Sequence, residues 1–243
     1  MRTPRDGLSS GDTRGDFVFG GARMAHFLPK AAIFDLDGTL TDSMYVWDRL
    51  PEELVRQFGG IPAPDLSHTL RAMSSPQAID YLIRTYHLPA TPQQLTQAME
   101  AIADREYREK VPLKPGVRPL LERLRQLGIP CCVATASQVH QARQALERLG
   151  VWSFFSFALS ATQYGPKTCP DLYLEAARRL GAGPEHTLVF EDALHAAQTA
   201  ARAGFPVVGV YDAFSQQDQD ALRSVCRWHL QRLDEPDFLA QLG

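Results

Sequence analysis

The chain has 243 residues, a formal net charge of −3 and 44% hydrophobic residues. That length suits one large domain, or one domain with an insertion, and the apolar share is enough for a sizeable core. The slightly negative charge argues against a nucleic-acid-binding surface, and no apolar run approaches the length of a membrane span. We therefore expect the partner to be a small molecule rather than a nucleic acid or a membrane.

Residues 1–29 are rich in Gly, Arg, Asp and Ser and show little periodicity, which is typical of a disordered leader. Their arginines are not followed by the apolar stretch of about 7–15 residues that a secretory signal contains. The four cysteines lack the spacing of a zinc site, and Cys131 and Cys132 lie in an apolar run that indicates core packing. A reducing cytoplasm is therefore the expected location.

The first strand is expected over 31–34, a short apolar run, and helical periodicity begins after Asp42. Apolar residues from Leu50 to Phe58 fall at helical spacing, and a glycine pair ends that run. Two further helices each have a proline in the first turn. The expected helices run from Asp42 to about residue 58, over 75–86 and over 91–109. No strand is indicated between them, so we expect a helical domain inserted over 43–113.

Helix and strand patterns alternate in the rest of the chain. The expected helices are 115–126, 138–149, 170–180 and 193–203, and the expected strands are 129–135, 154–160, 187–190 and 206–210. Alternation of this kind predicts a parallel sheet with helices on both faces. We therefore predict an α/β fold with a doubly wound parallel sheet, formed by residues 30–42 and 114–243, with the helical domain inserted near its start.

Two carboxylates, Asp35 and Asp37, directly follow the first strand and precede a Gly-Thr turn. Open α/β sheets bind their ligands at the carboxyl ends of the strands. Two acidic groups at so short a separation need a cation or a proton to compensate their charges. This need indicates a metal site and phosphoryl chemistry. A plain polar turn is the alternative, whereas a calcium loop would need a further series of acidic residues that does not follow.

Three later segments at strand ends also carry polar groups. Thr135 and Ser137 lie before a helix, where hydroxyls and free N–H groups suit a phosphate oxygen, although a simple helix cap would use the same residues. Lys167 lies in a loop with a glycine and two prolines, and it could neutralise a phosphate or a nucleophile, or be an ordinary exposed lysine. Glu191 and Asp192 offer oxygen ligands that suit Mg²⁺, although acidic residues also favour helix N-termini.

Taken together, these segments resemble the signatures of the haloacid dehalogenase-like hydrolase superfamily, in its helical-cap branch (subfamily IA), over about residues 31 to 235. The first signature is Asp35-Leu36-Asp37-Gly38-Thr39-Leu40. The second is Thr135, the third is Lys167 followed by Pro170-Asp171, and the fourth is Glu191-Asp192. In the fourth, Ala193 and Ala196 stand where many relatives have Ser and Gly, a departure that could alter metal geometry or rate.

The resemblance implies catalytic roles for four residues. Asp35 attacks phosphorus and forms an aspartyl-phosphate, and Asp37 protonates the leaving oxygen and then deprotonates water. Thr135 holds the phosphoryl group, and Lys167 offsets its charge. The residues expected to contact the substrate or its phosphate are Leu36, Thr135, Ala136, Lys167, Arg71 and Ser137.

The same resemblance implies Mg²⁺ as cofactor. Its expected ligands are Asp35, Asp37 through its backbone carbonyl, Glu191 and Asp192. The helical insertion corresponds to a mobile cap that closes over the substrate and excludes water. The expected function is therefore a Mg²⁺-dependent phosphatase acting on a small phosphorylated metabolite.

Other branches of the superfamily fit less well. Dehalogenases lack an acid/base residue like Asp37. Phosphonate-cleaving members use a cap lysine, whereas the only lysines of the cap region here, Lys110 and Lys114, lie at its exit. A β-phosphoglucomutase-like phosphosugar mutase is the alternative that stays open. Trp47 stands in place of its cap His, and the nearest match to its cap Arg is Ser75, although Arg71, four residues away, could substitute for that Arg. A non-catalytic binding protein is a third alternative, which the presence of every motif residue disfavours.

The cap and the loops that face it choose the leaving group in this family. The candidate residues are Met44, Tyr45, Trp47, Arg71 and Ser74 in the cap and Ser137 and Gln138 in the core. Their aromatic and apolar share indicates a substrate body that is not purely polar, although Tyr45 and Trp47 could equally pack the cap. His195 is expected to be a packing or surface residue rather than a ligand.

Overall fold

The computed structural model describes residues 27–70 and 73–242. Most of the predicted leader, residues 1–26, and the candidate Arg71 lie outside this part of the chain. Phe27 packs against Trp228 with ring centroids 5.8 Å apart, so residue 27 already contacts the core. None of the helices in the described residues is long and apolar enough to cross a membrane.

A six-stranded sheet forms the centre of the molecule, in the order β3-β2-β1-β4-β5-β6. Its strands are β1 (Ala31–Phe34), β2 (Cys131–Thr135), β3 (Phe155–Ser160), β4 (Thr187–Glu191), β5 (Val207–Val210) and β6 (Trp228–Leu230). All neighbouring strands pair in parallel. The topological switch point of the sheet lies at β1, because β2 is its neighbour on one side and β4 on the other. The predicted doubly wound parallel sheet is confirmed.

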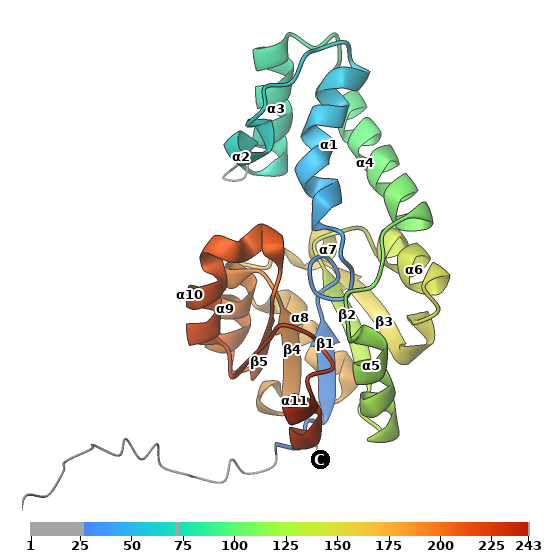
Figure 1. Ribbon diagram of the computed structural model, residues 1–243, viewed down its shortest axis with the longest axis vertical. Helices are drawn as coiled ribbons and strands as arrows, with labels where there is room; N and C mark the ends of the chain where they lie inside the picture. Colours follow the sequence, from blue (N-terminus) through green and yellow to red (C-terminus); the bar gives the residue numbers. More distant parts are fainter. Residues whose placement is uncertain (1–26, 71–72, 243) are drawn as a thin grey trace, which may run out of the picture.

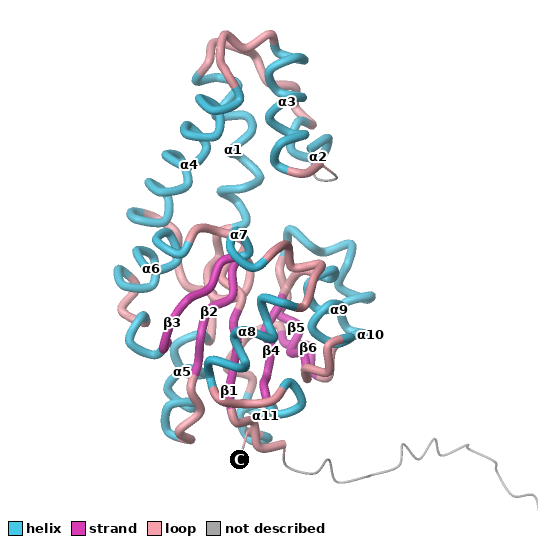
Figure 2. Tube along the Cα trace, turned by 180° about the vertical axis from the view of Figure 1, so that it is seen from behind, coloured by secondary structure: helices cyan, strands magenta, loops and turns pink. Residues whose placement is uncertain are grey.

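Helices cover both faces of the sheet, as the fully buried β1 requires. Ala32 and Phe34 face one hydrophobic cluster, and Ile33 faces the other. The first cluster contains α5 (Val117–Gln126), α6 (Val139–Arg148) and α11 (Pro236–Gln241). The second contains α8 (Asp171–Leu180), α9 (Leu194–Arg202) and α10 (Gln219–Val225). Figure 2, the view from behind, shows α8 lying over its face of the strands.

The segment between β1 and α5 forms a helical body at one end of the sheet (Figure 1). It contains α1 (Met44–Gln57), α2 (Leu66–Leu70), α3 (Ser75–Tyr86) and α4 (Pro92–Glu109). These helices share a hydrophobic cluster of their own, with Leu54 and Leu95 almost completely buried. Thr91 begins α4 by accepting the Gln94 N–H at 3.3 Å, and Pro92 occupies the first turn. We call these four helices and the connections between them the cap; its exact limits and its mobility remain predictions.

Several elements differ from the expectation. Helix α1 begins at Met44, close to Asp42, after which the sequence predicts helical periodicity, and it accommodates Pro51 although proline lacks an N–H. Short helices such as α2 and α7 (Ala161–Tyr164) have too few residues for a periodic pattern. At the C-terminus, β6 has only three residues, and it was not predicted because so short an edge strand shows no alternation.

The loop after β1 depends on Gly38. Its φ of +86° lies in the left-handed region, where a side chain is unfavourable. A Cβ atom at this position would lie 2.4 Å from Oδ2 of Asp192, the residue that follows β4. The absence of a side chain therefore lets the β1 loop approach the end of β4.

Gly38→Ala is expected to destabilise the protein more than Gly59→Ala does. Gly59 has a similar φ of +83° but nothing within 4 Å of the added Cβ. Both variants carry the backbone penalty of about 1–2 kcal/mol, and Gly38→Ala adds an overpacking cost of about 1–3 kcal/mol. Urea denaturation of both variants measures the difference. Equal losses of unfolding free energy in the two variants would show that stability does not depend on the close approach of Gly38 to Asp192.

Candidate active site

A cavity of about 820 Å³ lies between the cap and the carboxyl ends of the strands. This is where doubly wound sheets bind ligands, and the volume lies in the usual range for small-molecule sites. Of the residues predicted to carry the chemistry or to bind phosphate or metal, seven line it: Asp35, Asp37, Ala136, Ser137, Lys167, Glu191 and Asp192. Segments that lie far apart in the sequence are therefore brought to one site.

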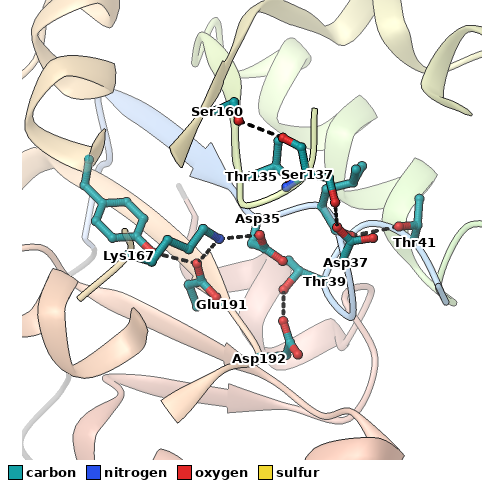
Figure 3. A network of polar contacts seen from close by, with 12 residues as sticks. Asp35, Asp37, Thr39, Thr41, Thr135, Ser137, Ser160, Lys167, Glu191 and Asp192 are labelled. Carbon is teal, nitrogen blue, oxygen red and sulfur yellow. Dashed lines mark hydrogen bonds and ion pairs between the residues drawn. The ribbon is translucent and has the colours of Figure 1, made fainter. Parts of the chain in front are cut away.

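Lys167 lies between two buried carboxylates, as Figure 3 shows. Its Nζ donates to Oδ1 of Asp35 and, at 2.5 Å, to Oε1 of Glu191. The hydroxyl of Tyr173, from α8, donates to the same Glu191 oxygen at 2.7 Å. Burial alone lowers the pKa of Lys167, but the charges of Asp35 and Glu191 outweigh it and raise that pKa above its ordinary value. The lysine therefore stays protonated, and it is an ion-paired group rather than an exposed loop residue.

Asp35, Glu191 and Asp192 form a buried acidic cluster whose candidate ligand oxygens lie within 4.8 Å of one another. Oε2 of Glu191 has no hydrogen-bond partner among the described residues. Burial, followed by the charges of Glu191 and Asp212, raises the pKa of Asp192 to about 7. Burial also raises the pKa of Asp35, although Lys167 opposes it. One lysine does not balance three carboxylates, so the cluster fits a hard cation that takes oxygen ligands.

Asp37 lies apart from this cluster, on the side of Asp35 away from Lys167 (Figure 3). Ser43 Oγ donates to its Oδ1 at 2.6 Å, and Ser137 Oγ donates to its Oδ2 at 2.6 Å. The hydroxyl of Tyr107, near the end of α4, also donates to Oδ1. Burial and then the charge of Asp37 raise the pKa of Tyr107, which keeps the phenol protonated as a donor. The Asp37 carboxylate is thus held by residues of the core and of the cap together.

Sequence reasoning did not find the roles of Tyr107 and Ser43. Tyr107 is 70 residues from Asp37 in the chain and reads as one more apolar position of a helix. Ser43 directly follows the first motif, so its proximity could have been a signal. Ser137, predicted to touch substrate, lines the cavity but already donates its hydroxyl to Asp37.

The two cap-exit lysines have structural contacts. Lys114 Nζ donates to the carbonyl oxygens of Gly38 at 2.7 Å and Tyr211 at 2.6 Å, and it pairs with Asp212 at 2.8 Å. It therefore ties the cap exit to the loop after β1 and to the loop after β5. Lys110 pairs with Glu106 on its own helix at 2.8 Å. Neither lysine is among the described residues that line the cavity.

Two of the expected phosphate contacts lie below the cavity surface. Thr135 is completely buried, and its Oγ1 accepts the Ser137 N–H at 2.9 Å. That bond orients the loop after β2, which exposes Ala136 to the cavity. Leu36 packs its side chain in the core, and its carbonyl oxygen accepts the N–H groups of Leu40 and Thr41. Direct contact of Thr135 or Leu36 with a phosphate remains a prediction.

The cap candidates divide into two groups. Met44 and Trp47 line the cavity, as do Ser75 and, on the core side, Gln138. Tyr45 and Ser74 are outside the lining. The Tyr45 hydroxyl lies 3.5 Å from Glu106, and Ser74, the N-cap residue of α3, donates its backbone N–H to the Gln77 side chain. His195, expected to be a packing or surface residue, is exposed and lines the cavity, outside the acidic cluster.

Known proteins resemble this chain over most of its length. The model of the haloacid dehalogenase-like hydrolase family matches residues 29–204. Phosphoglycolate phosphatase of Rhodobacter capsulatus is 29% identical over 207 residues, which cover 83% of this chain and 93% of that protein. Hexitol phosphatase A of Escherichia coli is 28% identical over 193 residues, which cover 74% of this chain and 82% of that protein.

A solved structure shares the fold. The crystal structure of a mutant of CbbY from Rhodobacter sphaeroides, in complex with xylulose-(1,5)bisphosphate, superposes with a TM-score of 0.75. Its sequence is 21% identical, and the match covers 89% of this chain and all of that one. The chain belongs to the haloacid dehalogenase-like hydrolases, in their helical-cap branch, and is a phosphoric monoester hydrolase.

Proposed function

We propose that the protein is a Mg²⁺-dependent phosphatase that hydrolyses a small phosphorylated metabolite through an aspartyl-phosphate on Asp35. The observation that carries this proposal is the site's division into two parts. Asp35 lies in an acidic cluster with Lys167 beside it, and Asp37 lies next to the cluster with its own hydroxyl donors. The two carboxylates that have different roles in this proposal therefore lie in different surroundings.

In the first step, an Asp35 carboxylate oxygen attacks phosphorus, and the ester P–O bond breaks. Asp37 gives its proton to the leaving oxygen, so that the alcohol departs neutral. In the second step, water attacks the phosphorus of the aspartyl-phosphate while Asp37 takes a proton from that water. Inorganic phosphate leaves, and Asp35 returns as a carboxylate. Lys167 supplies positive charge beside the transferring group throughout.

A bound Mg²⁺ would add the positive charge that one lysine cannot supply, and it would draw the phosphate toward Asp35. The unpartnered Glu191 oxygen and the elevated Asp192 pKa support a cation in the cluster. The proposed ligands are Asp35, Glu191 and Asp192, with the backbone carbonyl of Asp37. Thr39 Oγ1 donates to Asp192 Oδ1 at 3.0 Å and would orient that ligand.

A phosphosugar mutase with the same nucleophile is the second candidate. It needs cap groups that hold a second phosphate, and the cavity has Trp47 and Ser75 where mutases have His and Arg. These replacements favour a phosphatase. A contact of Arg71 with the substrate, and the expected cytoplasmic location, remain predictions.

Replacing the nucleophile should stop turnover without unfolding the protein. Asp35→Asn is expected to reduce phosphate release from p-nitrophenyl phosphate and a panel of sugar phosphates below detection, because a neutral amide oxygen is a poor nucleophile. The far-UV circular dichroism spectrum should be unchanged. Asp237→Asn, at an exposed position of α11 outside the cavity, is the matched control and should retain activity. Release by Asp35→Asn at the parent rate would refute the assignment, and conversion of β-glucose 1-phosphate without release would favour the mutase.

Magnesium binding can be measured without turnover. At a concentration about a hundredfold above Kd, Mg²⁺ is expected to raise the Tm by about 5 °C or more. Asp192→Asn should lose this shift, and in EDTA it should melt no lower than the parent, because it removes one of the crowded carboxylates. Asp237→Asn should keep the shift. A parent protein whose Tm and phosphatase activity are both indifferent to Mg²⁺ and EDTA would remove the metal from the proposal.

Tyr107 is expected to be a positioning residue for Asp37. Tyr107→Phe keeps the ring but removes the donor that reaches Asp37 from the cap, so kcat should fall by about tenfold while KM changes by less than about twofold. Tyr45→Phe, a nearby cap tyrosine outside the cavity lining, is the control and should leave both constants unchanged. A rise in KM with unaltered kcat would instead assign Tyr107 to substrate binding.

A further inference from the structure

The cap side of the cavity is almost entirely apolar, whereas the core side carries the polar groups. Among the described cap residues that line the cavity, Ser75 and Glu100 are the two with polar side chains. The apolar wall has residues from α1, α3, α4 and the α2–α3 connection: Met44, Trp47, Pro51, Met73, Ala78 and Met99. The two walls therefore offer very different environments to a bound molecule.

These six residues are only half-buried, unlike Leu54 and Leu82, which complete the cap's own core. Their uncovered surface faces the cavity, so a ligand could bury it. Three of them are methionines, whose flexible thioethers adapt to a flat or irregular apolar shape and make favourable contacts with aromatic rings. The indole of Trp47 adds a rigid aromatic face.

A strongly polar substrate body finds few partners on this wall. Each hydroxyl of a sugar that is buried without a hydrogen bond costs about 1–3 kcal/mol. Among the described lining residues a second phosphate would meet no free cation, because Lys167 is the one lysine or arginine among them and is already paired with Asp35 and Glu191. Glu100, on the cap side, would repel such a group.

We infer that the substrate is a phosphate monoester with one phosphate, whose alcohol carries an uncharged, largely apolar body of about the size of an aromatic ring. This inference rests on the proposed phosphatase function and names its substrate class. The phosphate lies against Lys167 and the acidic cluster with its cation, and the apolar body lies against Met73, Met99 and Trp47. Water is displaced from that wall when the ester binds, which supplies the binding free energy.

Three esters of primary alcohols test the inference, because their leaving oxygens are chemically alike and their bodies differ. They are 2-phenylethyl phosphate, ethyl phosphate and glucose 6-phosphate, each assayed for phosphate release with Mg²⁺. The expected kcat/KM for 2-phenylethyl phosphate exceeds that for ethyl phosphate by about tenfold or more, and exceeds that for glucose 6-phosphate. A kcat/KM for glucose 6-phosphate equal to or above that for 2-phenylethyl phosphate would overturn the inference while leaving the phosphatase proposal intact.

A pair of variants on α4 locates the effect. Met99→Gln puts an amide into the apolar wall, and Ala101→Gln puts the same amide on the exposed side of the same helix, outside the lining. The ratio of kcat/KM between 2-phenylethyl and ethyl phosphate is expected to fall by about fivefold in Met99→Gln and to stay at the parent value in Ala101→Gln. Because the ratio is taken within one preparation, partial unfolding does not alter it.

The remaining outcomes are also decisive. An unchanged ratio in Met99→Gln would remove the cap wall from substrate selection and overturn the inference. Release from none of the three esters, nor from p-nitrophenyl phosphate, would overturn the proposed function and with it this inference.

Discussion

Crowding of three buried carboxylates around a single lysine is the constraint on which the rest of the site depends. Asp35, Glu191 and Asp192 come from the ends of adjacent strands, and Lys167 pairs with two of them. Such a cluster is electrostatically unfavourable without more positive charge. The fold has to hold it together by packing, and the same imbalance makes the site attract a cation and, through it, a phosphate.

The packing that holds the cluster is visible in the two loops that meet there. Gly38 has no side chain, so the loop after β1 can touch Asp192. Lys114 then joins that loop to Asp212 and to the end of the cap. The position of the carboxylates and the exit of the cap are therefore fixed by one connected set of contacts, so the chemistry and the cap are mechanically linked.

Most of this arrangement could be predicted from the sequence, because it depends on patterns formed by residues close together in the chain. Apolar runs and their spacing predicted the parallel sheet. Asp35, Lys167 and Asp192 were candidates because each follows a predicted strand, and their roles came from the resemblance to the haloacid dehalogenase-like hydrolases. The missed features depend on tertiary contacts. Tyr107 looks like an ordinary helical core position until α4 brings it to Asp37, and β6 is too short to have a pattern. The residues that form the cap wall of the cavity likewise depend on which faces of α1, α3 and α4 meet, and the sequence does not show this.

The polar core side and the apolar cap side of the cavity differ because they are built from different kinds of structure. Its core side is made by strand ends, where backbone and side-chain polar groups have to be satisfied, so it carries fixed charges suited to a phosphate. Its cap side is made by helices that already pack on one another, so the residues left facing the cavity, such as Met73 and Met99, continue the cap's apolar interior. Changes on that wall leave the acidic cluster untouched, so selection of the alcohol can vary while the phosphoryl chemistry stays the same. Tyr107 is the exception, because it belongs to the cap and yet holds Asp37, and through it the position of α4 acts on the proton donor itself.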